Sequence, residues 1–559
     1  MRCVSIGWRM SLCALMGLPL ASRMATAQAP ITTGEHSLLE RAVQPHREKI
    51  LLVPLDDRPA TTQFAQMIGA IANVQVDTPP ADMLGRFVVP GQPDEILRWM
   101  ATQDLGAYQS VIVNTEMIAY GGLIASRTDS TAYDAAIVRL RRLWGLRKAN
   151  PGTKFYAFTS IQRIAPTALS TNANWRTALS DLVILKSSIG GKPTPKQVDR
   201  ARALRDRIPS GAVEQYYATR DRNHRVQQEL LRMVAAKAFD YMVLGQDDAQ
   251  PVGPHSGESR RLQSLADRLK VNDKVYFCEG IDQHSNVLVC RSLLAEHGWS
   301  PRVRVVFADS IGKNKIAPYE SDHVENSLLD QLEASGARAA RGDESAEFSL
   351  YVNTPDPRPD HFEQFLNQMI DEIDQGFPVA VADINLGYTG TGDPRLFDAL
   401  QQTGRWMKLL AYAGWNTAGN TMGTTIPAAT VYLLARRFDA DPLARELSQR
   451  AFLLHRMVND FEYHRFVRPE AYALQRQMGV EKEETYGTAF DALNSFVRRD
   501  MTQRVMSAFN SQFLGKRFFA DTKEYEIGGI RGLSVDLPWP RAYEVRIGFQ
   551  LVAHEASER

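Results

Sequence analysis

Neither charge dominates this sequence of 559 residues, and no long apolar run occurs after residue 30. Lys and Arg total 65 against 64 for Asp and Glu, which leaves a net charge of +1. Nucleic acids and anionic membranes attract basic surfaces, so we expect neither as a partner. A helix that spans a bilayer needs about 20 predominantly apolar residues, so we expect no membrane association once the leader described below is removed.

Cysteine is also scarce, with four residues in the whole chain. No CxxC or HExxH spacing is present, which excludes the common zinc-binding motifs. Cys3 and Cys13 lie in the expected leader, so only Cys278 and Cys290 would remain. An oxidising compartment would permit a disulfide between these two residues, and a pair of buried thiols is the alternative.

The first 29 residues have the order of a secretory signal peptide. Arg2 and Arg9 precede an apolar run from Met10 to Ala21, and the small residues from Ala25 to Ala29 resemble a cleavage site. A membrane anchor is the weaker interpretation, because the run is short and contains Pro19. We therefore predict a leader at 1–29, a polar linker at 30–48, and a periplasmic or secreted protein.

The remaining sequence predicts an α/β fold with two parallel-sheet, Rossmann-like domains. Hydrophobic residues make up 44% and charged residues 23%, as in globular proteins. Near-continuous apolar runs alternate with helical patterns, which is typical of a parallel sheet covered on both faces. The expected strands are residues 50–53, 74–76, 110–113, 154–158, 241–244, 274–277, 303–307, 349–352, 379–382 and 408–412. We divide them into domains at 49–300 and 301–435, followed by a helical C-terminal region with terminal strands at 436–559.

Acidic residues follow several expected strands of the first domain. Ligands bind beyond the carboxyl ends of strands in open parallel sheets, so these residues are candidates for catalysis. One Asp after a strand is what a helix N-cap requires, but acids or amides after five strands are harder to explain by capping. The candidate catalytic residues are Asp56, Asp57, Glu116, Asp247 and Asp248. Arg58 and Arg163 are candidate substrate-binding counter-charges, and structural ion pairs are the alternative.

The second domain contributes amides and an aromatic ring. Trp415 stands beside Asn416 and close to Asn420, a combination that suits a sugar ring and its hydroxyl groups. A buried Trp with Asn capping the next helix is the alternative. Asp383 precedes a glycine-rich loop and is a further candidate for substrate binding. The loop lacks GxxxxGK[ST], and no GxGxxG follows the first strand, so a nucleotide cofactor is not supported.

Four strings together resemble the bacterial domain-of-unknown-function family 4127. They are Pro54-Leu55-Asp56-Asp57-Arg58-Pro59, Tyr120-Gly121-Gly122-Leu123, Gly245-Gln246-Asp247-Asp248 and Tyr412-Ala413-Gly414-Trp415-Asn416-Thr417. The resemblance covers nearly all of the mature chain. It implies a shared bacterial fold and assigns no reaction.

Three functions compete on this evidence. The leading hypothesis is an exported glycoside hydrolase with a carboxylate acid/base pair, about 5–10 Å apart, acting on a bacterial or environmental glycan without a cofactor. The second is a divalent-metal-dependent hydrolase, in which the carboxylates would hold a hard cation such as magnesium, calcium or manganese. The third is a periplasmic sugar-binding protein without turnover, because two α/β domains suit closure on a ligand.

Overall fold

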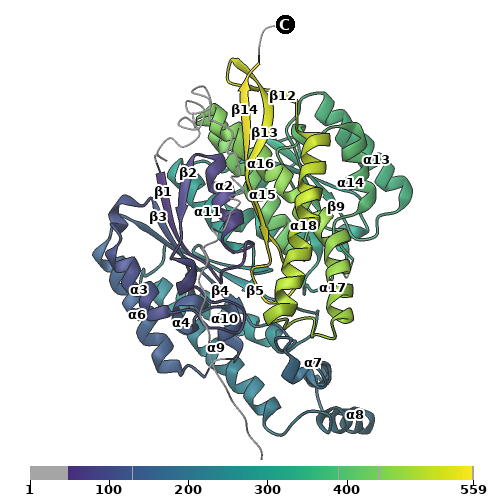
Figure 1. Ribbon diagram of the computed structural model, residues 1–559. Helices are drawn as coiled ribbons and strands as arrows, with labels where there is room; N and C mark the ends of the chain where they lie inside the picture. Colours follow the sequence, from purple (N-terminus) through teal and green to yellow (C-terminus); the bar gives the residue numbers. More distant parts are fainter. Residues whose placement is uncertain (1–47, 129, 388, 439–440, 557–559) are drawn as a thin grey trace, which may run out of the picture. The chain divides into compact units, whose positions relative to one another are not determined.

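The first α/β domain is built on a six-stranded parallel sheet (Figure 1). The computed structural model describes residues 48–128, 130–387, 389–438 and 441–556, so the predicted leader and almost all of the linker lie outside the described residues. Across the sheet the strands are ordered β2 (Val74–Asp77), β1 (Glu48–Val53), β3 (Ser110–Asn114), β4 (Lys154–Ile161), β5 (Tyr241–Gln246) and β6 (Val275–Glu279). The order reverses between β1 and β3, which in such sheets opens a crevice at the carboxyl ends.

Alternation along each strand sends side chains to two different cores. In β1, Ile50 and Leu52 pack into one buried cluster and Leu51 and Val53 into another. Helices therefore cover both faces, with α3, α6 and α9 on one and α2 and α11 on the other (Figure 1). The helices of this domain are α2 (Gln63–Ile71), α3 (Pro93–Thr102), α4 (Thr115–Tyr120), α5 (Leu123–Thr128), α6 (Tyr133–Ala149), α7 (Arg176–Ser188), α8 (Pro195–Arg205), α9 (Ala212–Ala235), α10 (Pro254–Leu269) and α11 (His284–Glu296).

The second domain repeats this plan with a five-stranded parallel sheet. Its strands are ordered β11 (Ala411–Ala413), β10 (Val379–Asp383), β9 (Phe348–Asn353), β7 (Arg302–Phe307) and β8 (Arg338–Ala339). Its helices are α12 (Val324–Ser335), α13 (Pro359–Asp374), α14 (Pro394–Thr403) and α15 (Ala418–Arg437). Short 3-10 turns complete both domains at η1 (Ala81–Met83), η2 (Leu105–Ala107), η3 (Ser170–Asn172), η4 (Gly312–Asn314) and η5 (Trp406–Lys408).

One layer of helices serves both sheets. Helices α2, α11, α12 and α15 contribute to a single apolar cluster that also contains Ile50 and Leu52 of the first sheet and Phe348 and Leu350 of the second. Because that cluster is continuous, the described residues form one compact unit. Within them, no helix is both long and apolar enough to cross a membrane.

The C-terminal region is helical and ends in its own antiparallel sheet. It comprises α16 (Pro442–Arg456), the π-helix η6 (Met457–Val467), α17 (Arg468–Gln477), α18 (Gly487–Gln512), β12 (Arg517–Ala520), β13 (Lys523–Asp536) and β14 (Arg546–Glu555). The three strands pair in sequence order and join neither parallel sheet. Strand β13 packs against α18, and both elements lie in the yellow part of Figure 1.

The predicted fold class is confirmed. Each apolar run that we expected to be a strand contains one, although Lys408 belongs to η5 and β11 covers only the end of its run. Cys278 and Cys290 are buried free thiols, which confirms the alternative that we gave to a disulfide. The two-residue strand β8 has no apolar run of its own, because it pairs only at the sheet edge.

Candidate functional site

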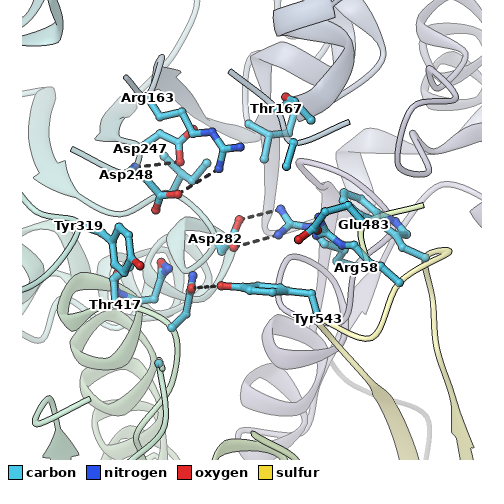
Figure 2. Close-up of a pocket in the computed structure, with 18 of the residues that line it drawn as sticks. Arg58, Arg163, Thr167, Asp247, Asp248, Asp282, Tyr319, Thr417, Glu483 and Tyr543 are labelled. Atoms are coloured by element: carbon cyan, nitrogen blue, oxygen red, sulfur yellow. Dashed lines mark hydrogen bonds and ion pairs between the residues drawn. The ribbon is translucent and has the colours of Figure 1, made fainter. Parts of the chain in front are cut away.

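One cavity of about 530 Å³ is lined by residues from both parallel sheets and from the C-terminal region. Segments that follow β1, β4, β5 and β6 form one side, and residues after β10 and β11 form the other. Residues of η6, α17 and the β13–β14 connection complete the wall. The carboxyl ends of parallel strands therefore converge on this cavity, as expected for open α/β sheets (Figure 2).

Arg58, directly after β1, links two acidic residues. Its Nη1 and Nη2 donate to the Asp282 carboxylate at 3.1 and 2.8 Å, and its Nε and Nη2 donate to Asp56 at 2.9 and 2.8 Å. Arg58 and Asp282 line the cavity, whereas Asp56 lies behind Arg58 and is 2% exposed. Although burial opposes its charge, the two carboxylates raise the pKa of Arg58. Asp56 thus positions the arginine that faces the ligand space.

The two acids after β5 face different arginines. Asp248 accepts a hydrogen bond from Nη1 of Arg163 at 3.0 Å, and Asp247 forms an ion pair with Arg127 of α5. All four residues line the cavity. The Asp248 side chain is 37% exposed and that of Asp247 is 7% exposed, so Asp248 is the one open to a ligand (Figure 2).

Asp57 is buried next to the cavity wall. Nε1 of Trp539 donates to its Oδ1 at 2.5 Å, and Trp539 itself lines the cavity. Burial, together with the charge of Asp56, raises the pKa of Asp57 to about 6, although the Trp539 hydrogen bond opposes this shift. Asp57 therefore holds the β13–β14 connection against the first domain and is not among the residues that line the cavity.

Glu116 is buried in the first domain, away from the cavity lining. It accepts hydrogen bonds from Thr159 Oγ1 at 2.7 Å, the Ser160 amide at 2.8 Å and Asn114 Nδ2 at 2.9 Å. Burial raises the pKa of its carboxyl group. With these partners Glu116 joins the ends of β3 and β4.

Asp383 has the corresponding place in the second domain. It accepts hydrogen bonds from Asn353 Nδ2 at 2.9 Å and from the Asp393 amide at 2.6 Å, and its side chain is fully buried. Burial, followed by the charge of Asp393, raises the pKa of Asp383 to about 7. The residue fixes the glycine-rich loop and does not line the cavity.

Trp415 is mostly covered by the protein. It is 6% exposed, its ring meets that of Phe64 edge-on at 5.4 Å, and its Nε1 donates to Thr424 Oγ1 at 3.3 Å. It does not line the main cavity but a small adjoining one of about 30 Å³, which shares Arg58 and Asp282 with the main one. Its ring is therefore not an open stacking platform in the main cavity.

Asn416 and Asn420 do line the main cavity. The Oδ1 of Asn416 accepts a hydrogen bond from the Tyr543 hydroxyl at 2.8 Å, a contact that joins the second domain to the β13–β14 connection (Figure 2). Asn420 is 2% exposed, and its Oδ1 has no hydrogen-bond partner in the described part of the chain. A buried amide oxygen without a partner is costly, which favours a ligand as the missing donor.

His464 of η6 lines the cavity, and we did not predict it from the sequence. Its Nδ1 lies 2.9 Å from the Gly390 carbonyl, and because a carbonyl only accepts, this nitrogen carries the proton. Burial and the charge of Arg468 lower the pKa of His464, so the ring is neutral and Nε2 keeps a lone pair. The free Nε2 can therefore accept a hydrogen bond from a bound molecule.

The C-terminal residues of the site carry no signal in the strand pattern of the sequence. Arg468, Arg541 and Tyr543 all line the cavity but follow no parallel strand, so the strand-end rule does not apply to them. The Pro538-Trp539-Pro540 string is the only local signal, since it marks a constrained connection between two strands.

Comparison with family models decides the classification. The model described as "Protein of unknown function (DUF4127)" matches residues 50–548. The chain belongs to this family. A search of curated proteins finds no match for it. The matched range includes every residue named above as lining the cavity, so the whole site lies within the family domain.

Proposed function

We propose that this DUF4127 protein is a hydrolase that cleaves a glycosidic bond in a carbohydrate held in the shared cavity. One observation carries the proposal: acidic, amide and hydroxyl side chains from both domains converge on a single cavity at the strand ends. Asp248 and Asp282 supply carboxylates, Asn416 and Asn420 supply amides, and Tyr543 supplies a hydroxyl group. This donor and acceptor set suits sugar hydroxyl groups.

Glycosidic hydrolysis requires one carboxyl group that protonates the leaving oxygen and one carboxylate that acts as base or nucleophile. Among the acids that line the cavity, we assign this pair to Asp248, which the sequence predicted, and Asp282, which it did not. Both line the cavity, and each is oriented by an arginine that belongs to a different strand end. We place the protein in the periplasm or outside the cell, where the predicted leader would send it and where glycans occur.

A metal-dependent hydrolase is the alternative to this proposal, and it would require several side chains grouped closely enough to hold a metal ion. Among residues 48–556, apart from the few undescribed positions, no three His, Cys, Asp or Glu side chains are grouped to hold a metal ion. Both Asp282 oxygens already accept from Arg58, and one Asp248 oxygen accepts from Arg163. The arrangement therefore favours acid–base chemistry by side chains, and activity that survives chelation would support it.

Asparagine variants of the two carboxylates test the proposal. The purified chain is first screened on aryl glycosides and cell-wall fragments, with and without chelator. On a substrate that is cleaved, Asp248→Asn and Asp282→Asn should each reduce kcat by about 100-fold or more, because an acid or base is lost. Exposed Asp199 of α8 provides the matched control Asp199→Asn, which should keep full activity.

Two outcomes would contradict this proposal. Silence of the folded wild-type protein across the panel would count against hydrolysis. Retained turnover in both asparagine variants would exclude Asp248 and Asp282 as the acid/base pair. If the wild type binds a glycan but neither it nor the variants cleave that glycan, the result supports the binding-protein alternative.

A further inference from the structure

The cavity carries more positive than negative charge. Seven cationic residues line it, namely Arg58, Arg127, Arg163, Arg176, Arg468, Lys482 and Arg541. Four carboxylates line it, namely Asp247, Asp248, Asp282 and Glu483. The whole chain is almost neutral, with a net charge of +1, so this excess is a local property of the site.

Ion pairs within the wall account for only part of these cations. Arg58, Arg127 and Arg163 pair with the aspartates described above, and Arg541 pairs with Glu544 at 3.0 Å. The other three cavity cations, Arg176, Arg468 and Lys482, form no ion pair with any described residue. Their charges are available to a ligand.

Arg468 is the most informative of the three. It is 7% exposed and begins α17. Its Nη2 donates to the Thr389 carbonyl, and its guanidinium lies 5.4 Å from the centre of the Tyr543 ring. Neither contact neutralises the charge. A buried guanidinium that forms no ion pair within the described part of the chain is costly, which favours binding of an anion from outside the chain.

Arg176 stands in a similar position at the start of α7. Its Nε donates to the Pro166 carbonyl at 2.7 Å, and no hydrogen bond within the described chain engages its terminal nitrogens. Burial and the nearby charge of Arg163 lower the pKa of Arg176. Burial, followed by Arg163, also lowers the pKa of Arg127. The arginines around the cavity thus repel one another, which a bound anion would relieve.

We propose that the substrate is an anionic carbohydrate, whose acidic group is bound by Arg468 and Arg176 while its hydroxyl groups meet Asn416, Asn420 and Tyr543. This inference rests on the proposed function for the carbohydrate part and on the unpaired arginines for the charge. The planar guanidinium matches both a sugar carboxylate and a phosphate or sulfate ester. Lys482, which is exposed at the cavity, adds attraction without defining a geometry.

Calorimetric titration of the full chain tests the charge directly and needs no turnover. The probes are glucuronate, glucose 6-phosphate, glucose 6-sulfate, inorganic phosphate and neutral glucose. At least one anionic sugar should bind about 10-fold or more tightly than glucose, and added salt should weaken it. Tighter binding of glucuronate identifies a carboxylate substrate, whereas tighter binding of an ester identifies a phosphate or sulfate.

Variants locate the effect. Arg468→Gln should weaken the anionic sugar by about 10-fold or more, because a charge-assisted contact is lost, and should leave glucose unchanged. Arg176→Gln should act in the same direction, and its half-buried position keeps the test available if Arg468→Gln fails to fold. The matched control is Arg465→Gln, an exposed residue of η6 that does not line the cavity.

Several results would overturn the inference. Equal binding of glucose and the anionic sugars would do so, as would equal affinities of the Arg468→Gln and Arg465→Gln variants. Binding of inorganic phosphate without tighter binding of any anionic sugar would remove the carbohydrate part. An anionic sugar that binds but is never cleaved in its glycosides would contradict the proposed function and leave this inference intact.

Discussion

Asn420 brings a buried amide to the cavity, and its oxygen has no hydrogen-bond partner among the described residues. Its main chain is held at the start of α15, where the Thr417 hydroxyl accepts from the Asn420 amide nitrogen at 3.3 Å. Gly280, with φ +80°, leaves room for the side chain, since a Cβ there would lie 3.0 Å from Asn420 Oδ1. The fold therefore tolerates an unsatisfied polar atom at this position, as binding sites commonly do.

Asn420→Ala should separate stability from binding. Removal of an unsatisfied oxygen should change the free energy of unfolding by less than about 1 kcal/mol, because little native hydrogen bonding is lost. The affinity for the anionic sugar should fall by up to about 10-fold. Urea denaturation and calorimetry measure the two effects. Asn286→Ala is the control, since Asn286 is buried but does not line the cavity, and it should leave the affinity unchanged. A loss of stability with unchanged affinity would show that Asn420 is structural.

At the level of single residues, the sequence predicted part of the site. Arg58, Asp247 and Asp248 line the cavity because parallel strands end at one edge of a sheet, a rule that needs only the strand positions. The same rule cannot distinguish an acid that faces the cavity from one that faces the core. Asp56 and Glu116 follow strands too, but their side chains turn to buried donors that belong to distant or later residues. Only the folded chain decides which way each carboxylate points.

Among the elements, the π-helix η6 contributes His464 and continues directly into Arg468 of α17. It is held by an ion pair between Arg456 and Asp460, 3.0 Å apart and fully buried. Asp460 also accepts from the Gly414 amide at 2.9 Å, which ties the helix to the end of β11. Burial raises the pKa of Asp460 to about 6 despite the adjacent arginine. The helix that supplies His464 and leads into Arg468 is thus anchored by one buried charge pair.

Asp460→Asn should therefore destabilise the protein strongly. The amide can still accept from Gly414, but Arg456 would be left as a buried, unpaired charge, and such losses cost about 3–5 kcal/mol. Chemical denaturation near neutral pH measures the change. Glu462→Gln on the same helix breaks a half-exposed pair with Arg504 and should cost about 1 kcal/mol or less. Equal losses in the free energy of unfolding for the two variants would show that the buried Arg456–Asp460 pair stabilises the protein no more than the Glu462–Arg504 pair does.

The elements themselves were partly predictable for a physical reason. Buried parallel strands are apolar on both faces, so they appear as continuous runs in the sequence. A π-helix has no comparable pattern, because its residues are a mixture of buried and exposed side chains at helical spacing. The three terminal strands alternate apolar and polar residues, but alternation does not say which sheet they join. In the structure they pair with one another.

Across the whole molecule, a pair of buried glutamates lies where the two domains meet. Glu279 ends β6 of the first sheet, and Glu320 lies in the connection that follows β7 of the second. Glu320 accepts from the Gly419 amide and from Ser327 Oγ, while Glu279 accepts from the Ser321 amide at 3.1 Å. Burial raises the pKa of both carboxyl groups, and the charge of Glu279 raises that of Glu320 further. The pair keeps a proton that exposed glutamates would have lost.

This pair predicts how stability depends on pH. Below the ordinary glutamate pKa of 4.5, both folded and unfolded chains are protonated at these sites and the full stability is present. As the pH rises, the unfolded chain releases protons first, because its pKa is lower, so the folded state loses stability until its own raised pKa is passed. Glu320→Gln keeps an acceptor for Gly419 and removes one of the two charges. The decline in melting temperature between about pH 5 and about pH 8 should therefore be smaller in this variant than in the wild type.

The matched control for this experiment is Glu333→Gln, an exposed residue of α12. It should reproduce the wild-type dependence on pH, because both members of the buried glutamate pair are still present in this variant. Parallel pH profiles for the wild type and Glu320→Gln would mean that the two glutamates are ionised in the folded protein. A smaller decline in Glu320→Gln alone would show that the buried glutamate pair, which lies between the two parallel sheets, makes the stability of the folded chain depend on pH.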